Sequence, residues 1–318
     1  MDTITLAADD GAQIDVLIWR PDCQPRGFIQ LVHGFAEYAA RYDEFAGCLA
    51  QAGWLVVASD HRGHGPRALV DGTLGQAPDR GYHQIVDDLC RVTDDVRSQH
   101  PKLPWILVGH SMGSFLARIV AARRGREMTA LVLLGTGASA GPLAKVARGA
   151  ATSQIVMAGE DSASRVMETL IFGSMNLRFR PVRTRFDWLS RQASEVDAYC
   201  NDPLCGFTAS VGLYRELVRL SETSNSSTIL RAIPPRLPVL LMSGDSDPVG
   251  GNGRGVRRVA GELTANGVLQ VDVHLEPDAR HELLHERDRE QTYRLLETWI
   301  GKTVEARSDH PRCAVSPR

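Results

Sequence analysis

The chain has 318 residues, of which 43% are hydrophobic and 23% are charged, and its formal net charge is −2. This composition is typical of a globular protein with a sizeable core, and it excludes the strongly basic surface that nucleic acid binding requires. We expect no signal peptide and no transmembrane segment, because no charged and apolar leader or long apolar run is present. The six cysteines are scattered, so we expect reduced thiols and a cytoplasmic location.

The first half of the chain alternates short apolar runs with helical patterns. Ile14, Val16 and Ile18 alternate with polar residues, as in a half-buried strand. Continuous apolar runs, typical of central parallel strands, occupy residues 28–32, 54–58, 105–108 and 131–134. Helical patterns occupy residues 41–52, 82–100 and 112–124. This order predicts a doubly wound, mostly parallel α/β sheet.

The alternation stops at Gly135. Apolar residues then recur at helical spacing and no strong strand appears until residue 236. Strand patterns resume at 239–242 and 271–275, and a last helical pattern covers about 286–300. The sequence therefore predicts a split core, a helical cap and a disordered polar tail. Their boundaries are 1–140 with 237–302, 141–236 and 303–318, respectively.

One pentapeptide, Gly109-His110-Ser111-Met112-Gly113, lies between an apolar run and a helical one. This is the G-x-S-x-G pattern of a nucleophile elbow, in which a strand turns sharply into a helix and lifts the serine above the sheet. The glycines leave room for the cramped backbone. The alternative is a glycine-rich turn that happens to contain a serine.

A serine nucleophile needs a base and a carboxylate that orients the base. In elbow sites the acid and then the histidine follow the serine along the chain, at the ends of later strands. We predict Asp247 as the acid in preference to Asp245, because Asp247 lies deeper in its loop and precedes Pro248. Asp245 is expected to be a turn residue.

The base is predicted to be His281, in the loop after the strand at 271–275. His274 is a weaker candidate because it lies within that strand, and His110 is expected to be a packed or exposed neighbour that points away from the serine. The oxyanion hole needs two backbone donors. We expect the amides of Met112, directly after the nucleophile, and Phe35, after the turn at Gly34.

With these residues the chain resembles α/β-hydrolases of the monoacylglycerol lipase and lysophospholipase group, also described as serine aminopeptidase-like hydrolases. The resemblance covers about residues 10–300. It is carried by His33-Gly34-Phe35-Ala36-Glu37 with Arg41-Tyr42, and by residues 59–65, 109–113, 244–249 and 280–282. Cap residues 201–207 resemble a bacterial branch of lysophospholipases. Tyr38 and Arg67 depart from the family, in which histidine and serine are common there, and they bear on substrate fit.

The resemblance implies an α/β-hydrolase fold and hydrolysis of monoacyl lipid esters through an acyl-enzyme. The expected function is that of a lysophospholipase or monoacylglycerol lipase, acting on a small-molecule ester with at most transient contact with a membrane surface. The alternative is a small-ester esterase or a serine aminopeptidase with the same triad. We expect no cofactor, no metal ion and no nucleic acid partner.

Several weaker patterns give competing interpretations. His281-Glu282-Leu283-Leu284-His285 spells the zinc protease signature, with Glu305 downstream, but Pro277 and the preceding strand place His281 in a loop. Residues 251–255 suggest a dinucleotide loop, but Val256 occupies the position of the third glycine. A ligand-binding hydrolase fold without turnover is a further alternative, disfavoured because all three triad members are present.

Two groups of cap residues bear on the substrate. An arginine cluster could meet a lipid phosphate, although a solvated or salt-bridged face is the favoured interpretation. It consists of Arg178, Arg180, Arg183 and Arg185. An apolar set is expected partly to pack the cap helices and partly to line an acyl-chain tunnel above Ser111. It consists of Met157, Val166, Met167, Leu170, Ile171, Phe172, Phe186 and Trp188.

Overall fold

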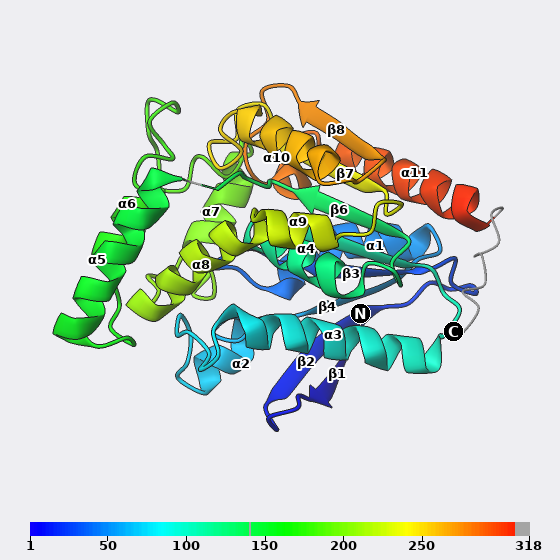
Figure 1. The fold of residues 1–318 in the computed structure, drawn as a ribbon, viewed down its shortest axis with the longest axis horizontal. Helices are drawn as coiled ribbons and strands as arrows, with labels where there is room; N and C mark the ends of the chain where they lie inside the picture. Colours follow the sequence, from blue (N-terminus) through cyan, green and yellow to red (C-terminus); the bar gives the residue numbers. More distant parts are fainter. Residues whose placement is uncertain (140, 309–318) are drawn as a thin grey trace.

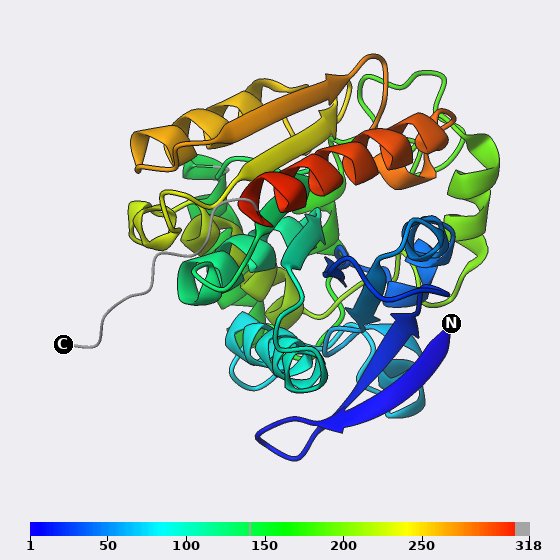
Figure 2. The same cartoon turned by 90° about the vertical axis from the view of Figure 1, so that its right-hand side faces the viewer.

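The computed structural model describes residues 1–139 and 141–308. In these residues eight strands form one sheet in the order β1-β2-β4-β3-β5-β6-β7-β8. The strands are β1 (Asp2–Ala7), β2 (Gln13–Trp19), β3 (Phe28–Val32), β4 (Leu55–Ser59), β5 (Trp105–His110), β6 (Ala130–Leu134), β7 (Val239–Gly244) and β8 (Val271–Glu276). Strands β3 to β8 are parallel, while β1 and β2 are antiparallel at one edge, where their hairpin extends beyond the sheet (Figure 2).

The central strands are buried along their whole length, which is why their sequences are continuous apolar runs. Alternate residues pack on opposite faces: Trp105 and Leu107 join one core cluster, and Ile106 joins the other. The first face is covered by α3 (Tyr82–Gln99), α4 (Met112–Arg124) and α10 (Arg254–Ala265). The second is covered by α1 (Asp43–Gln51) and α11 (Arg289–Ser308) (Figures 1 and 2). A short helix, α2 (Gly65–Val70), follows β4.

Between β6 and β7 the described chain forms five helices joined by turns and loops, with no strand of the sheet. These are α5 (Pro142–Ala158), α6 (Arg165–Phe172), α7 (Ala193–Asn201), α8 (Val211–Ser224) and α9 (Ser227–Ala232). Figure 1 shows α5 and α6 at one end of the molecule, with α8 between them and the rest of the chain. The division into core and cap domains stays a prediction, and the name cap is kept for residues 141–236.

The predicted doubly wound α/β fold is confirmed. The predicted disordered tail is wrong for residues 303–308, because α11 continues to Ser308. Val304 is buried in the core cluster on that face, and Arg307 donates hydrogen bonds to the carbonyls of Thr129 and Arg236. The rest of the predicted tail, residues 309–318, lies outside the described residues.

Register between the strands brings the predicted site segments together. Val32, the last residue of β3, lies opposite Gly109 of β5, so the loop after β3 runs beside the turn after β5. In the same way β7 pairs with β8 up to Gly244 and Glu276. The loops that carry Asp247 and His281 therefore leave the sheet at the same edge as Ser111.

Candidate active site

Ser111 occupies a strained turn between β5 and α4. Its φ is 51°, which is rare for a residue with a side chain, and its amide donates to the carbonyl of Leu134 at 2.9 Å. The flanking glycines are required by close approaches. A Cβ on Gly109 would lie 2.3 Å from the oxygen of Gly113, and one on Gly113 would lie 2.0 Å from the oxygen of Val32. This is the geometry of a nucleophile elbow.

His281 and Asp247 meet across their two loops. Nδ1 of His281 lies 3.0 Å from Oδ2 of Asp247, and both side chains are buried. Asp247 is fixed from two further sides, because Ser243 Oγ donates to Oδ2 at 2.9 Å and the Val249 amide donates to Oδ1 at 2.8 Å. Ser111 and His281 line the same pocket. The three predicted residues are therefore brought together at one sheet edge.

The competing candidates lie elsewhere. Asp245 is exposed and accepts hydrogen bonds from Ser246 and from the amide of Asp278. His274 stays within β8, where its Nε2 lies 2.9 Å from Glu276. His110 is buried with Nδ1 turned to Glu37, at 3.0 Å, and its ring lies 4.9 Å from that of His281.

The loop after β3 presents the second predicted oxyanion donor. The Gly34 amide donates to Glu37 Oε1 at 2.6 Å, and a Cβ on Gly34 would come within 3.2 Å of the Ser111 Cβ. The loop therefore passes directly against the elbow. Among the described residues, neither the Phe35 amide nor the Met112 amide donates to a protein acceptor, so both are available to an oxyanion.

A buried network of charges connects this loop to the residue after His281. Arg41 donates through both terminal nitrogens to Glu282, at 2.8 Å each, and through Nη1 to Glu37 Oε2 at 2.6 Å. Burial acts to raise the pKa of Glu37, but the hydrogen bond from His110 and the charge of Arg41 hold the pKa well below its usual value. Burial likewise opposes ionisation of Glu282, and the charge of Arg41 keeps its pKa low.

No role for Glu37, Arg41 or Glu282 in such a network could be predicted from the sequence, although all three lie in segments that carry the family resemblance. The only local signal was the spacing of Glu37 and Arg41, which lie four residues apart just after the turn at Gly34. Glu282 lies 241 residues from Arg41, so no pattern along the chain connects them.

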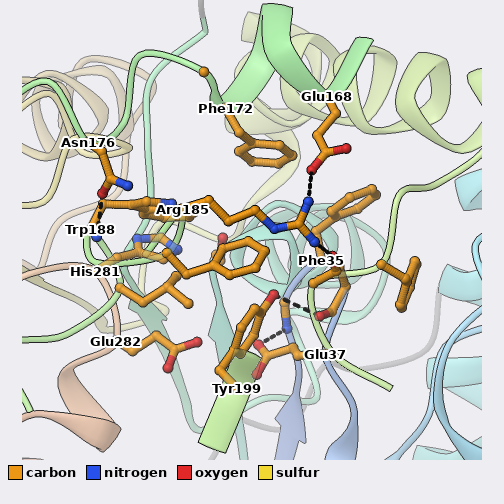
Figure 3. Close-up of a pocket in the computed structure, with 18 of the residues that line it drawn as sticks. Phe35, Glu37, Glu168, Phe172, Asn176, Arg185, Trp188, Tyr199, His281 and Glu282 are labelled. Carbon is orange, nitrogen blue, oxygen red and sulfur yellow. Dashed lines mark hydrogen bonds and ion pairs between the residues drawn. The ribbon is translucent and has the colours of Figure 1, made fainter. Parts of the chain in front are cut away.

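A pocket of about 520 Å³ opens above Ser111 and His281. Its cap side is formed by aromatic rings that include Phe172, Phe186 and Trp188, and Figure 3 shows Phe172 facing into it. Other members of the predicted acyl-chain set do not line it. Met157 and Val166 are exposed, whereas Met167, Leu170 and Ile171 pack within the cap.

The arginine cluster is partly salt-bridged. Arg183 pairs with Asp197, and Arg185 pairs with Glu168 at 2.9 Å. Figure 3 shows Arg185 reaching across the pocket toward Glu168, so this one member of the cluster lies where substrate would enter.

The zinc interpretation does not fit the geometry. His281 and Glu282 lie in a loop, and only Leu283–His285 form a short 3-10 turn, so no helix presents the two histidines on one face. Nε2 of His285 bonds the carbonyl of Arg41 at 3.0 Å, and Glu305 faces Arg26. His281 and His285 therefore bond different residues, Asp247 and Arg41, and do not face a shared metal site.

A doubly wound sheet that carries this elbow, with a histidine on a buried carboxylate, defines an α/β-hydrolase. The chain belongs to the serine aminopeptidase S33 family, whose match covers residues 23–288. It is 31% identical to a monoacylglycerol lipase of Mycolicibacterium smegmatis over 93% of this chain and 95% of that one. It is also 31% identical to a human monoglyceride lipase, over 75% and 71%.

A solved structure with the same fold is that of a highly thermostable carboxyl esterase from Bacillus coagulans, in complex with glycerol. The two agree with a TM-score of 0.89 and 30% identity, over 95% of this chain and 98% of that one. Together these relatives establish that the chain is a carboxylic ester hydrolase, with a small-molecule ester as its substrate, as the sequence predicted.

Proposed function

We propose that the chain is a lipase for monoacylglycerols, which uses Ser111 as nucleophile, His281 as general base and Asp247 as the acid that orients His281. The observation that carries this proposal is the pocket of about 520 Å³, roofed by aromatic rings of the cap, directly above Ser111. A single acyl chain buried there gains roughly 0.8 kcal/mol per methylene. The lipases of M. smegmatis and human, as relatives, support the same substrate class.

In this mechanism His281 takes the Ser111 hydroxyl proton while Oγ forms a bond to the ester carbonyl carbon. The carbonyl π electrons move to the oxygen, which accepts hydrogen bonds from the amides of Phe35 and Met112. Collapse of this intermediate breaks the ester C–O bond, and the leaving alkoxide receives the proton from His281. Water then repeats the sequence on the acyl-enzyme and releases a fatty acid.

A lysophospholipid is the second candidate substrate. Arg165 and Arg185 both line the pocket, and a guanidinium is well suited to hold a phosphate. A phospholipase of Bacillus subtilis, 24% identical over 90% of this chain, supports this candidate.

The location and membrane contact that we propose are those of a cytoplasmic enzyme that touches lipid surfaces transiently. No described helix has the length and hydropathy needed to cross a membrane. The exposed apolar side chains of the cap helices, Leu143, Val146, Val156, Met157 and Val166, would supply the contact. The cysteines in the described part of the chain are free thiols, which supports a reducing compartment. The net charge of −2 supports the absence of a nucleic acid partner.

The decisive experiment compares wild-type protein with Ser111→Ala on monoacylglycerol, lysophosphatidylcholine and an aminoacyl-naphthylamide. We expect the variant to lose at least about a thousandfold in kcat with an unchanged fold. We also expect labelling by a fluorophosphonate in the wild type only, and full activity in EDTA. Near wild-type turnover by the variant would overturn the assignment, and preference for the naphthylamide would favour an aminopeptidase.

A further inference from the structure

The carbonyl of Ala36 is held by the cap. It accepts one hydrogen bond from the Tyr199 hydroxyl at 2.8 Å and another from the Gly206 amide at 2.9 Å. Figure 3 shows Tyr199 at the wall of the pocket, with a dashed line that marks the hydrogen bond from its hydroxyl. Ala36 follows Phe35, so the cap forms its hydrogen bonds to the residue directly after the predicted oxyanion donor.

The backbone at Ala36 needs this support. Its φ is 52°, a left-handed conformation that is unfavourable for a residue with a Cβ. The core holds the residues around it by other contacts: the Gly34 amide donates to Glu37 at 2.6 Å, and the Gly34 carbonyl lies 2.8 Å from Nδ1 of His33. Within the described chain, no core residue bonds the carbonyl of Ala36 itself. The Phe35 amide therefore lies between a peptide fixed by the core and a peptide fixed by the cap.

Both cap donors are themselves fixed in place. Tyr199 is buried, with its ring edge against Phe186 at 4.8 Å between centroids and the Arg41 guanidinium stacked at 4.8 Å. Gly206 has a φ of 58°, and a Cβ there would lie 2.5 Å from the Phe186 ring. Its carbonyl accepts a bond from Arg185 at 2.6 Å. We call the two hydrogen bonds to the Ala36 carbonyl the clamp. Its donors pack against Phe186 and Arg185, which line the substrate pocket.

We infer that Tyr199 is a positioning residue for the oxyanion hole: its hydroxyl, with the Gly206 amide, holds Ala36 so that the Phe35 amide faces the oxyanion. The inference rests on the proposed function. It adds that the cap does more than enclose the acyl chain, since catalytic competence of the core loop depends on two hydrogen bonds from the cap.

Tyr199→Phe tests the clamp, because it removes the hydroxyl and leaves the packed ring. Tyr82→Phe is the matched control: Tyr82 also donates to a cap residue, Thr223, at 3.2 Å, but it does not line the pocket or bond Ala36. Both are compared with wild type on a p-nitrophenyl ester, with active sites counted by fluorophosphonate titration so that unfolded protein is not included. Binding of an alkyl trifluoromethyl ketone, whose adduct with Ser111 carries an oxyanion, is measured in parallel.

For Tyr199→Phe we expect kcat to fall about tenfold with KM within twofold, and the Ki of the ketone to rise by a similar factor, because a misplaced donor weakens binding of the oxyanion only. Tyr82→Phe should stay within twofold of wild type in kcat, KM and Ki. The inference is overturned if Tyr199→Phe keeps kcat and Ki within twofold of wild type, or if Tyr82→Phe loses as much as Tyr199→Phe. Either result would leave the proposed function intact, since loss of activity in Ser111→Ala tests that separately.

Discussion

Oδ2 of Asp247 lies 3.0 Å from Nδ1 of His281, and the exposed fractions of the two residues are 0% and 2%. His281 lines the pocket, whereas Asp247 does not. A carboxylate in that position fixes the tautomer with Nε2 free to act as a base, and stabilises the imidazolium that forms in the reaction. Because Ser243 and Val249 also donate to Asp247, the carboxylate cannot turn away without losing two other hydrogen bonds.

Asp247→Asn should therefore lower kcat by about 10³- to 10⁴-fold while the protein still folds. Asp245→Asn is the matched control, since Asp245 lies two residues away, is exposed, and its side chain bonds only loop residues. We expect its kcat to stay within a few-fold of wild type. Steady-state kinetics on one p-nitrophenyl ester measures both, and the reverse ranking would mean that the acid had been assigned to the wrong carboxylate.

The buried pair of Arg41 and Glu282 should matter for stability. Glu282→Gln leaves the Arg41 guanidinium with one carboxylate in place of two, in a site where the Arg41 side chain is only 9% exposed. Loss of one partner from a buried pair costs about 3 to 5 kcal/mol, and the remaining bond to Glu37 places the expected value near the lower end.

Glu290→Gln serves as the control for that measurement. Glu290 pairs with Arg294 at 3.5 Å on the surface of α11, with both side chains mostly exposed. Exposed pairs contribute about 1 kcal/mol or less. Urea unfolding at neutral pH gives both values, and equal losses in the two variants would contradict a special role for the buried network.

Asp60 should make stability depend on pH. Burial raises the pKa of Asp60 to about 6 from an ordinary value of 3.8, although the Ala39 amide donates to it at 2.7 Å. Between these values the folded state binds more protons than the unfolded state, so this contribution is complete below pH 3.8 and is lost as pH rises through 6. The loss amounts to about 3 kcal/mol at most.

Asp60→Asn keeps an acceptor for the Ala39 amide and cannot ionise. Unfolding free energies at pH 4, 5, 6 and 7 should therefore decline less with pH in this variant than in wild type. The difference between the two curves isolates Asp60 from other titrating groups. Parallel curves would show that Asp60 titrates normally in the folded protein.

The strands and the three triad candidates could be predicted because each depends on local pattern and chain order. A strand buried on both faces has a continuous apolar sequence, and parallel strands put their following loops at one edge. The approach of His281 to Asp247 at the edge that carries Ser111 could therefore be predicted without coordinates, while their catalytic roles stay predictions. The half-exposed β1 gave no such run. The end of α11 was misjudged because the burial of Val304 depends on where the helix packs.

Contacts between distant segments were beyond the reach of sequence patterns. The bond of Tyr199 to Ala36 spans 163 residues, and that of Arg41 to Glu282 spans 241. No sequence periodicity indicates either hydrogen bond, because both depend on how the cap and the loop after β8 pack against the core.

The pocket leads to a prediction about acyl length. Its cap side is aromatic, and Phe172 lies within 5.8 Å of Phe35 and 6.1 Å of Trp188 between ring centroids, directly above the site. Each methylene that enters should raise kcat/KM by up to about fourfold, which corresponds to roughly 0.8 kcal/mol. For esters from acetate to palmitate, measured below their micelle concentrations, kcat/KM should rise over several carbons and then level off.

Phe172→Ala should flatten that rise, because it removes an aromatic wall that only the longer chains reach, while acetate hydrolysis stays within a few-fold of wild type. Val166→Ala is the control on the same helix: Val166 is 58% exposed and does not line the pocket, so the length profile should not change. If kcat/KM instead fell steadily from acetate upward in the wild type, the pocket would not be an acyl site. The same triad would then belong to a small-ester esterase or an aminopeptidase, and the aromatic rings of the cap would serve only to pack it.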